Sequence, residues 1–370
     1  MPLSPQIEQE REGAPTSPGN ALAGAPPLEP VAAPKEKKSV TQRRARLSAR
    51  SGLIRIVCFF GLIVILLFGL NAMINSGLRR VTTSQFGVSN KIVQGKINAD
   101  IVISGSSRAL THYDPRIIER ITGWRTFNIG LNGSQTDMQL ARLKAYLKHN
   151  KKPKLLVQNL DLYSFLTSHE IYEPAQYVPY LREESIYAGV RRVYPDAWKW
   201  KYLPVYGYAV EDMRFSWMMG LKALFGIQPR EDHFDGYQPR DTSWTGDFEK
   251  FRANNRDGVV VKTEAQGLRD FEELLSLCAQ RGIPVLVVYS PEYYEMQAIT
   301  RNRKEVLEKA KQIAAHFGFP LWDYSESPIS RDRSNFYNSQ HLNRSGASAF
   351  SADFARRLIQ TGLVGGQDRP

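Results

Sequence analysis

Short apolar runs alternate with stretches of helical periodicity over most of the chain. The predicted strands are 100–104, 125–129, 154–158, 283–289 and 320–323, and the predicted helices are 114–122, 134–149, 264–281, 302–317 and 344–359. Strands that alternate with helices in this way are typical of parallel βαβ units. The pattern therefore predicts an α/β protein with a doubly wound parallel sheet, in which functional groups gather at the carboxyl ends of the strands.

The longest apolar run is Leu53–Ile74, which contains one charged residue, Arg55, near its start. A helix of about 22 residues at about 1.5 Å per residue spans a bilayer core of about 30 Å. A cleaved signal peptide is the main alternative, but about 50 residues precede the run and no clear small-x-small cleavage site follows it. We therefore expect an uncleaved, single-pass signal anchor over residues 51–75.

The net charge of +12 is unevenly distributed. Residues 1–50 are rich in proline, lack aromatic residues and end in a basic cluster, so we expect a disordered cytoplasmic tail. With this cluster upstream of the span, the positive-inside rule predicts a bacterial inner-membrane protein whose main domain is periplasmic. Because the basic cluster is explained by the orientation of the chain across the membrane, the positive net charge gives little support to the alternative, nucleic-acid binding. We expect no nucleic-acid partner.

Composition excludes two further classes of protein. A hydrophobic fraction of 42% is too high for a wholly disordered chain. Cys58 and Cys278 are the only cysteines, so neither a disulfide framework nor a cysteine-rich zinc site can be built. We expect no metal and no organic cofactor.

After the anchor, we expect a linker at 76–97 and one domain at 98–370, interrupted by an insertion at 163–260. The insertion is dense in tyrosine and tryptophan. Three interpretations stay open: an ordinary hydrophobic subdomain, a wall on which sugar rings stack, or a contact with the outer membrane leaflet through Phe215–Phe225.

Glycine-rich or polar turns follow the first three predicted strands, and a histidine loop precedes the last predicted helix. The four segments are Ser104–Arg108, Asn128–Gln135, Gln158–Asp161 and Asn338–Ala347. A serine at a strand-to-helix turn projects into the crevice at the sheet edge, where helix N–H groups support developing negative charge. Of the six histidines, His341 is the one that falls in a loop at this edge.

In this order, the four segments resemble the SGNH (GDSL-like) hydrolase superfamily, over residues 98–162 and 264–361. The resemblance implies a flavodoxin-like sheet of about five strands and a serine esterase mechanism. It makes Ser107 the nucleophile and its N–H an oxyanion donor, Gly133 and Asn159 further oxyanion donors, and His341 the general base. More narrowly, the chain resembles membrane-anchored envelope members related to alginate O-acetylation and teichoic acid D-alanyl transfer proteins.

The chain departs from the superfamily pattern at two positions. Ser106 stands where Gly-Asp-Ser has its aspartate, and Asn338 stands where Asp-x-x-His has its acid. An asparagine orients an imidazole through its carbonyl oxygen but supplies no charge to the imidazolium. A slow Ser-His dyad, a substitute acid at Asp332 or Asp323, and a degenerate enzyme are the open alternatives.

Two further residues have open roles. Arg108 is a candidate contact for an anionic or sugar substrate, with a helix-surface ion pair as the alternative. Asp161 is the second candidate substrate contact. It lies two positions after Asn159, so the two compete for the same place at the sheet edge.

Together these features predict a serine esterase or O-acyl transferase, with acetyl as the expected acyl group. Its expected substrate is an envelope or exported polysaccharide, and an acyltransferase in the membrane is a candidate partner. The alternative is a non-catalytic SGNH-like protein that binds polysaccharide or takes part in assembly.

Overall fold

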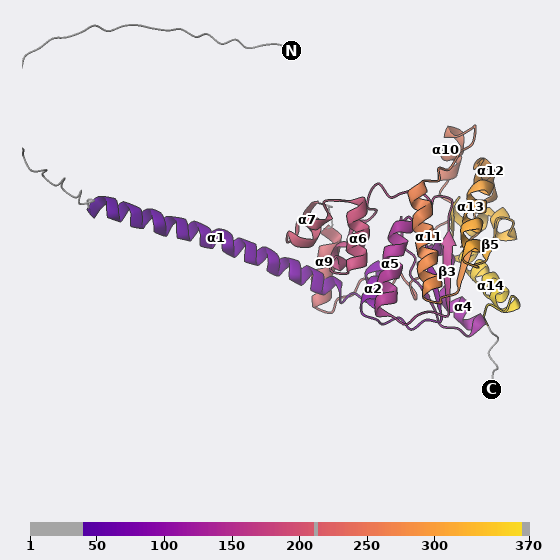
Figure 1. Ribbon diagram of the computed structural model, residues 1–370, viewed down its shortest axis with the longest axis horizontal. Coiled ribbons are helices and arrows are strands. Elements are labelled where there is room, and N and C mark those ends of the chain that lie inside the picture. Colours follow the sequence, from indigo (N-terminus) through magenta and orange to yellow (C-terminus); the bar gives the residue numbers. More distant parts are fainter. Residues whose placement is uncertain (1–39, 211–213, 365–370) are drawn as a thin grey trace, which may run out of the picture. The chain divides into compact units, whose positions relative to one another are not determined.

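The computed structural model describes residues 40–210 and 214–364, and its centre is a five-stranded parallel sheet (Figure 1). The strands are β1 (Ile101–Ser104), β2 (Thr126–Asn128), β3 (Leu155–Leu160), β4 (Val285–Tyr289) and β5 (Leu321–Asp323). Their order is β2-β1-β3-β4-β5, and every neighbouring pair is parallel. This is the flavodoxin-like strand order, so the predicted doubly wound sheet is confirmed.

Helices cover both faces of the sheet. They are α3 (Ser107–His112), α4 (Pro115–Thr122), α5 (Thr136–His149), α11 (Ala265–Gln280), α12 (Tyr294–Ile299), α13 (Arg303–His316) and α14 (Arg344–Gln360). Successive strand residues point to opposite faces, so Val102 joins the core under α5, α11 and α13, whereas Ile101 and Ile103 join the core under α4 and α14. The strands are apolar on both faces because both are buried.

The segment expected to be a linker, 76–97, is largely structured. Helix α2 (Ser84–Val93) buries Phe86, Val88 and Ile92 in the core next to α5. The amide of Asn90 donates hydrogen bonds to the carbonyls of Leu78 and Val81, both at 2.8 Å. These apolar positions and this buried amide hold the segment to the domain, which an extended tether would not do.

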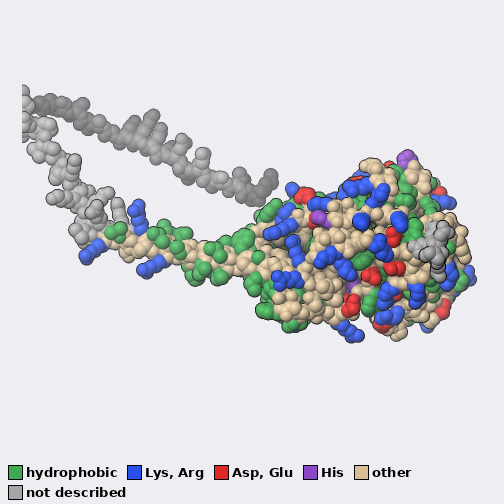
Figure 2. Space-filling view, turned by 90° about the horizontal axis from the view of Figure 1, so that it is seen from below, with side chains coloured by type: hydrophobic (Ala, Val, Ile, Leu, Met, Phe, Trp, Pro, Cys, Tyr) green, Lys and Arg blue, Asp and Glu red, His purple; other side chains and the backbone are tan. Residues whose placement is uncertain are grey.

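Helix α1 (Val40–Leu78) contains the apolar run of the N-terminal region. Its Leu47–Leu78 part is long and apolar enough to cross a membrane, and among the described residues it is the one helix that meets both criteria. Its side chains up to Met73 are largely exposed, and Figure 2 shows hydrophobic side chains along this helix. Of the expected disordered tail, residues 1–39 lie outside the described residues, while 40–50 are helical, since they continue α1.

The C-terminal end of α1 is part of the main domain. Ile74 and Leu78 are buried in its core. The side-chain oxygen of Asn71 accepts a hydrogen bond from the N–H of Val205 at 3.1 Å, and that of Asn75 accepts one from the hydroxyl of Tyr208 at 2.7 Å. Both partners come from the insertion, so the insertion and the last turns of α1 form one packed unit.

Outside residues 211–213, which are not described, the insertion contributes two short 3-10 turns, η1 (Pro174–Gln176) and η2 (Val178–Tyr180), and five helices. These are α6 (Glu184–Val193), α7 (Ala197–Tyr202), α8 (Tyr206–Val210), α9 (Arg214–Leu224) and α10 (Asp247–Asn254). Many of its aromatic side chains are buried, among them Tyr180, Trp200 and Tyr208, as in an ordinary hydrophobic subdomain. Phe215 and Phe225 are 79% and 80% exposed. Contact of this segment with a membrane leaflet therefore stays a prediction.

Helices α1 and α9 cross at a pair of glycines. A Cβ atom on Gly77 would lie 1.8 Å from the carbonyl oxygen of Gly220, so a side chain there forces the helices apart. We expect Gly77→Val to destabilise the domain by about 1–3 kcal/mol, the usual effect of overpacking, measured by thermal unfolding of the detergent-solubilised full chain. Gly69→Val is the matched control, because Gly69 lies in the same helix with no atom within 4 Å of its Cβ position. Equal melting temperatures for the two variants would contradict the crossing.

Candidate active site

Ser107 is the first residue of α3, directly after β1. The side chain of Ser106 caps the helix by accepting a hydrogen bond from the N–H of Arg108 at 3.3 Å. Gly105 has φ +145°, and a Cβ there would lie 2.9 Å from the carbonyl oxygen of Asn159. Glycine thus allows the sharp strand-to-helix turn that presents Ser107 at the carboxyl edge of the sheet.

A small antiparallel hairpin, β6 (Phe336–Asn338) and β7 (His341–Leu342), brings the histidine to this edge. The Nε2 atom of His341 lies 2.8 Å from the Oγ atom of Ser107. On the other side of the ring, Nδ1 lies 2.9 Å from the Oδ1 atom of Asn338. The structure therefore brings together three of the residues singled out in the sequence, in the geometry of a nucleophile, a base and an orienting group.

Two backbone donors decide which way the amide of Asn338 points. Its Oδ1 atom accepts hydrogen bonds from the N–H groups of Gln340 and His341, at 3.1 and 3.0 Å. An oxygen must therefore face the hairpin, and this same oxygen faces Nδ1 of His341. Nδ1 then carries the proton as a donor, which leaves Nε2 as the acceptor for the Ser107 hydroxyl. Asn338 thus selects the tautomer in which Nε2 can accept the proton of the Ser107 hydroxyl, although it lacks a charge.

Neither substitute acid reaches the histidine. The carboxylate of Asp323 accepts from the N–H of Ser325 at 2.8 Å, and that of Asp332 accepts from the N–H of Ser334 at 2.9 Å. Both close local turns. The partner of the imidazole is the amide of Asn338.

The surroundings of His341 oppose its protonation. Burial, followed by the positive charges of Arg108 and Arg240, lowers its pKa from 6.5 to about 3. The ring of Tyr337 stacks on the imidazole with a centroid distance of 5.3 Å and an interplanar angle of 17°. His341 is therefore neutral around pH 7, so Nε2 has a free lone pair, but its low pKa makes it a weak base. Among the described residues, no carboxylate contacts the ring to stabilise an imidazolium.

A pocket of about 200 Å³ opens over the Ser107 hydroxyl. It is lined by Ser106, Ser107, Arg108, Gly133, Ser134, Gln135, Asp161, Leu162, Tyr163, Glu292, Gln340 and His341. Neither the N–H of Ser107 nor that of Gly133 has a hydrogen-bond acceptor among the described residues. Gly133 has φ +61° and its Cβ position lies 2.3 Å from the ring of Tyr172, so glycine is needed there. The two free N–H groups are suited to an oxyanion.

Asn159, the third expected oxyanion donor, does not line the pocket. It is fully buried; its Oδ1 atom accepts from the Tyr113 hydroxyl at 2.8 Å, and its Nδ2 atom donates to the carbonyl of Leu160 at 3.3 Å. Asp161 lines the pocket instead and accepts from the Ser106 hydroxyl at 2.5 Å. Strand β3 continues through Leu160, so Asp161 is the first residue free of the strand and turns toward the site.

Arg108 is neither exposed nor part of a helix-surface ion pair. It is 3% exposed, and its guanidinium donates to the carbonyls of Ser290 and Pro291. It also lies 4.6 Å from the centre of the Tyr289 ring and 4.0 Å from the Glu292 carboxylate. Arg108 thus ties the loop after β4 to α3 and places a positive charge next to the nucleophile.

No sequence pattern singled out His112, which contacts the backbone of the β6–β7 hairpin at Leu342. It is fully buried; its Nε2 atom accepts from the N–H of Leu342 at 3.1 Å, so Nδ1 donates to the hydroxyl of Ser290 at 2.9 Å. Burial, followed by the charge of Arg108, holds the pKa of His112 well below its usual value. A neutral His112 therefore fixes the residue that follows His341. Glu292 was missed as well, although its loop follows a predicted strand at the same edge.

Within residues 40–210 and 214–364, no three His, Cys, Asp or Glu side chains are grouped to hold a metal ion. The pocket beside Ser107 presents serine, histidine, amide and backbone groups. Those groups are the parts of a nucleophilic serine site.

The chain matches no protein-family profile, and no curated protein matches it. Solved structures do show similarity. One, assigned as an acylhydrolase from Bacteroides fragilis, has 11% identity, a TM-score of 0.34, and coverage of 71% of this chain and 87% of its own. A second, assigned to the G-D-S-L family of lipolytic proteins from Desulfitobacterium hafniense, has 11% identity, a TM-score of 0.34, and coverage of 70% and 99%. A GDSL-like lipase from Bacteroides thetaiotaomicron has 8% identity, a TM-score of 0.33, and coverage of 75% and 100%.

Proposed function

We propose that the protein is a membrane-anchored serine esterase or O-acyl transferase. The observation that carries this proposal is the chain of contacts from Ser107 to His341 to Asn338, at 2.8 and 2.9 Å. It lies beside the free N–H groups of Ser107 and Gly133 in an open pocket. A serine, a correctly oriented imidazole and two unpaired donors are the parts that acyl transfer requires.

The first half-reaction makes an acyl-enzyme. As the Oγ atom of Ser107 attacks the ester carbonyl, its proton passes to Nε2 of His341. Negative charge then develops on the former carbonyl oxygen, where the N–H groups of Ser107 and Gly133 stabilise it. The ester C–O bond breaks, the leaving alcohol takes the proton from His341, and the acyl group stays on Ser107.

The second half-reaction decides between hydrolysis and transfer. His341 removes a proton from water or from an acceptor hydroxyl as that oxygen attacks the acyl carbon. The bond from the acyl carbon to Oγ of Ser107 then breaks, and His341 returns the proton to Oγ. Water gives a free carboxylic acid, whereas a sugar hydroxyl gives a new ester. The pocket is open to solvent and lined by hydrogen-bonding groups such as Gln135, Asp161 and Gln340, which suits sugar hydroxyls.

We extend the proposal to an envelope or exported polysaccharide as substrate, acetyl as the acyl group, and an acyltransferase in the membrane as a partner. The apolar part of α1 and the basic cluster that precedes it support an inner-membrane anchor with the domain in the periplasm. A rival function, non-catalytic binding of polysaccharide, is favoured by one observation: the amide of Asn338 replaces the usual acid, and the pKa of His341 is lowered to about 3.

Covalent labelling distinguishes the two functions. We expect a serine-directed fluorophosphonate to label the detergent-solubilised full chain on Ser107, identified by mass spectrometry of the tryptic peptide. Labelling needs a nucleophilic serine and an oxyanion site, and a binding protein has no need of either. Absence of label on the folded protein, or label on another residue only, would reject the enzyme in favour of the rival.

A further inference from the structure

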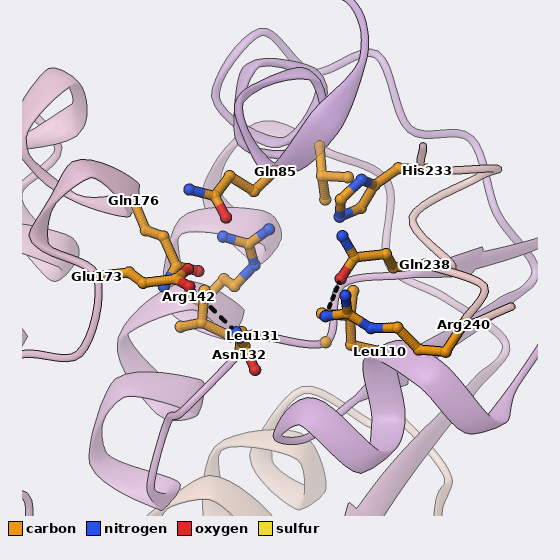
Figure 3. A pocket seen from close by; sticks show the side chains of 12 residues that line it. Gln85, Leu110, Leu131, Asn132, Arg142, Glu173, Gln176, His233, Gln238 and Arg240 are labelled. Carbon is orange, nitrogen blue, oxygen red and sulfur yellow. Dashed lines mark hydrogen bonds between the residues drawn. The ribbon is translucent and has the colours of Figure 1, made fainter. Parts of the chain in front are cut away.

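A second pocket, of about 200 Å³, shares the glycine loop of the active site (Figure 3). Gly130, Leu131 and Asn132 line this second pocket, while the following residue, Gly133, lines the catalytic one. Leu110 also lines it, from the same short helix whose first residue is Ser107. The two pockets are therefore neighbours in the structure.

The second pocket is rich in hydrogen-bond donors. Gln85 of α2, Gln176 of η1, Asn132 and Gln238 contribute amides. Figure 3 shows that these side chains and the guanidinium of Arg142, from α5, point toward a common space. Elements far apart in the sequence thus converge on a cavity whose lining is mainly polar, with Val88, Leu110 and Leu131 as its apolar members.

Arg142 is buried without a counter-ion. It is 7% exposed, its Nη1 atom donates to the hydroxyl of Ser89 at 3.1 Å, and its Nε atom has no partner. Among the described residues, no carboxylate lies within 4.0 Å of its guanidinium. Burial lowers its pKa from 12.5 to about 10, so it is still charged at neutral pH. An unpaired buried charge is costly, which makes an anion from outside the chain a fitting partner.

Arg240 adds a second positive charge. Its Nη2 atom donates to Oε1 of Gln238 at 2.9 Å, and its Nε atom is unpartnered. The one carboxylate in the lining belongs to Glu173, which is exposed and lies 3.4 Å from the amide of Asn132. Two arginines against one glutamate leave the lining positive, with the buried charge on the inside and the acidic one at the rim.

Arg240 also connects the second pocket to the catalytic histidine. Its guanidinium lies 6.0 Å from the centre of the Tyr337 ring, and Tyr337 in turn stacks on His341 with a centroid distance of 5.3 Å. A ligand bound by Arg240 is therefore one side chain away from the reacting groups. This is where the remainder of a substrate bound at Ser107 would extend.

We infer that the second pocket binds an anionic group, a carboxylate or a phosphate, carried by a sugar unit of the substrate. Arginine presents the donor geometry that both groups accept in two parallel hydrogen bonds. The surrounding amides suit the hydroxyls of the sugar that carries the charge. The claim that this ligand is part of the substrate rests on the proposed function. The claim that the pocket binds an acidic sugar is independent of that function. The substrate class is then an acidic glycan.

Calorimetric titration of the detergent-solubilised full chain at constant ionic strength tests the inference. The probes are glucuronate for the carboxylate, glucose 6-phosphate for the phosphate, and glucose as the neutral control. We expect at least one acidic sugar to bind and glucose to bind about 10-fold or more weakly. Arg142→Gln should lower the affinity for the acidic sugar about 10- to 100-fold, the range expected for the loss of a charge-assisted hydrogen bond.

Two variants serve as matched controls. Glu173→Gln removes the negative charge at the rim and should tighten binding, whereas Lys311→Gln removes an exposed charge on α13 and should change nothing. Arg142→Gln should also raise the melting temperature of the ligand-free protein, since it removes an unpaired buried charge. This measurement confirms that the variant is folded.

The outcomes separate the two proposals. Binding of glucuronate alone identifies the carboxylate, and binding of glucose 6-phosphate alone identifies the phosphate. Equal affinity for glucose and both acids, or unchanged affinity in Arg142→Gln, overturns the anion site. Because calorimetry needs no turnover, a protein that binds the acid through Arg142 but takes no fluorophosphonate label would keep this site while losing the esterase.

Discussion

Replacing Ser107 by alanine is expected to slow hydrolysis of p-nitrophenyl acetate by the full chain about 10³-fold or more. The variant keeps the pocket and the two free N–H groups but has no oxygen to attack the ester. Loss of a serine nucleophile removes the covalent route and leaves only the small acceleration due to binding and the oxyanion site. Initial rates in detergent, corrected for spontaneous hydrolysis, measure the difference.

The neighbouring serine is the control for this experiment. Ser106 donates to the carboxylate of Asp161 at 2.5 Å and caps α3, and it makes no contact with His341. Ser106→Ala should lower the rate far less than Ser107→Ala and keep the fluorophosphonate label on Ser107. If Ser106→Ala were the inactive variant, the nucleophile would have been assigned to the wrong hydroxyl.

Asn338→Asp is expected to raise kcat/KM at neutral pH about 10- to 100-fold. The aspartate is isosteric, and one of its oxygens can keep the three contacts made by Oδ1, to Nδ1 of His341 and to two backbone N–H groups. The new negative charge stabilises the imidazolium formed as Ser107 attacks, and a neighbouring opposite charge typically shifts a pKa by about 1–3 units. The measurement is steady-state hydrolysis of the same ester.

The pH profile of the same two proteins reports on the histidine. Activity needs neutral His341, and its pKa is lowered to about 3 in the wild type, so kcat/KM should stay level as the pH falls from 8 to about 5. In Asn338→Asp the carboxylate raises this pKa, so activity should start to fall at a higher pH. Asn343→Asp, which adds the same charge at the N-cap of α14, should leave the profile unchanged. A slower Asn338→Asp enzyme with an unshifted profile would contradict the role of Asn338.

The features that could be predicted from the sequence are those set by local patterns. All five strands of the sheet and helices α4, α5, α11, α13 and α14 follow from apolar periodicity, whereas α3 and α12 do not. Ser107, Asn338 and His341 lie in turns at the ends of regular elements, and their expected roles follow from the resemblance to the SGNH pattern. Their contact could be anticipated because parallel strands end at one edge of the sheet.

The remaining features depend on where elements end and what covers them. Whether Asn159 or Asp161 faces the pocket depends on one further residue of β3, which no local pattern specifies. The burial of Arg108 depends on the loop after β4, some 180 positions away. The second pocket needs segments from α2, α5, η1 and the region around Gln238 to meet, which only the folded chain shows.

The packing of Ile74 and Leu78 into the domain core determines what proteolytic removal of α1 would do to the rest of the chain. A protease that cut after Leu78 would remove two core side chains and uncover the face of α8 and α9 that Asn71, Asn75 and Gly77 occupy. The released fragment would present a fresh apolar surface and tend to aggregate.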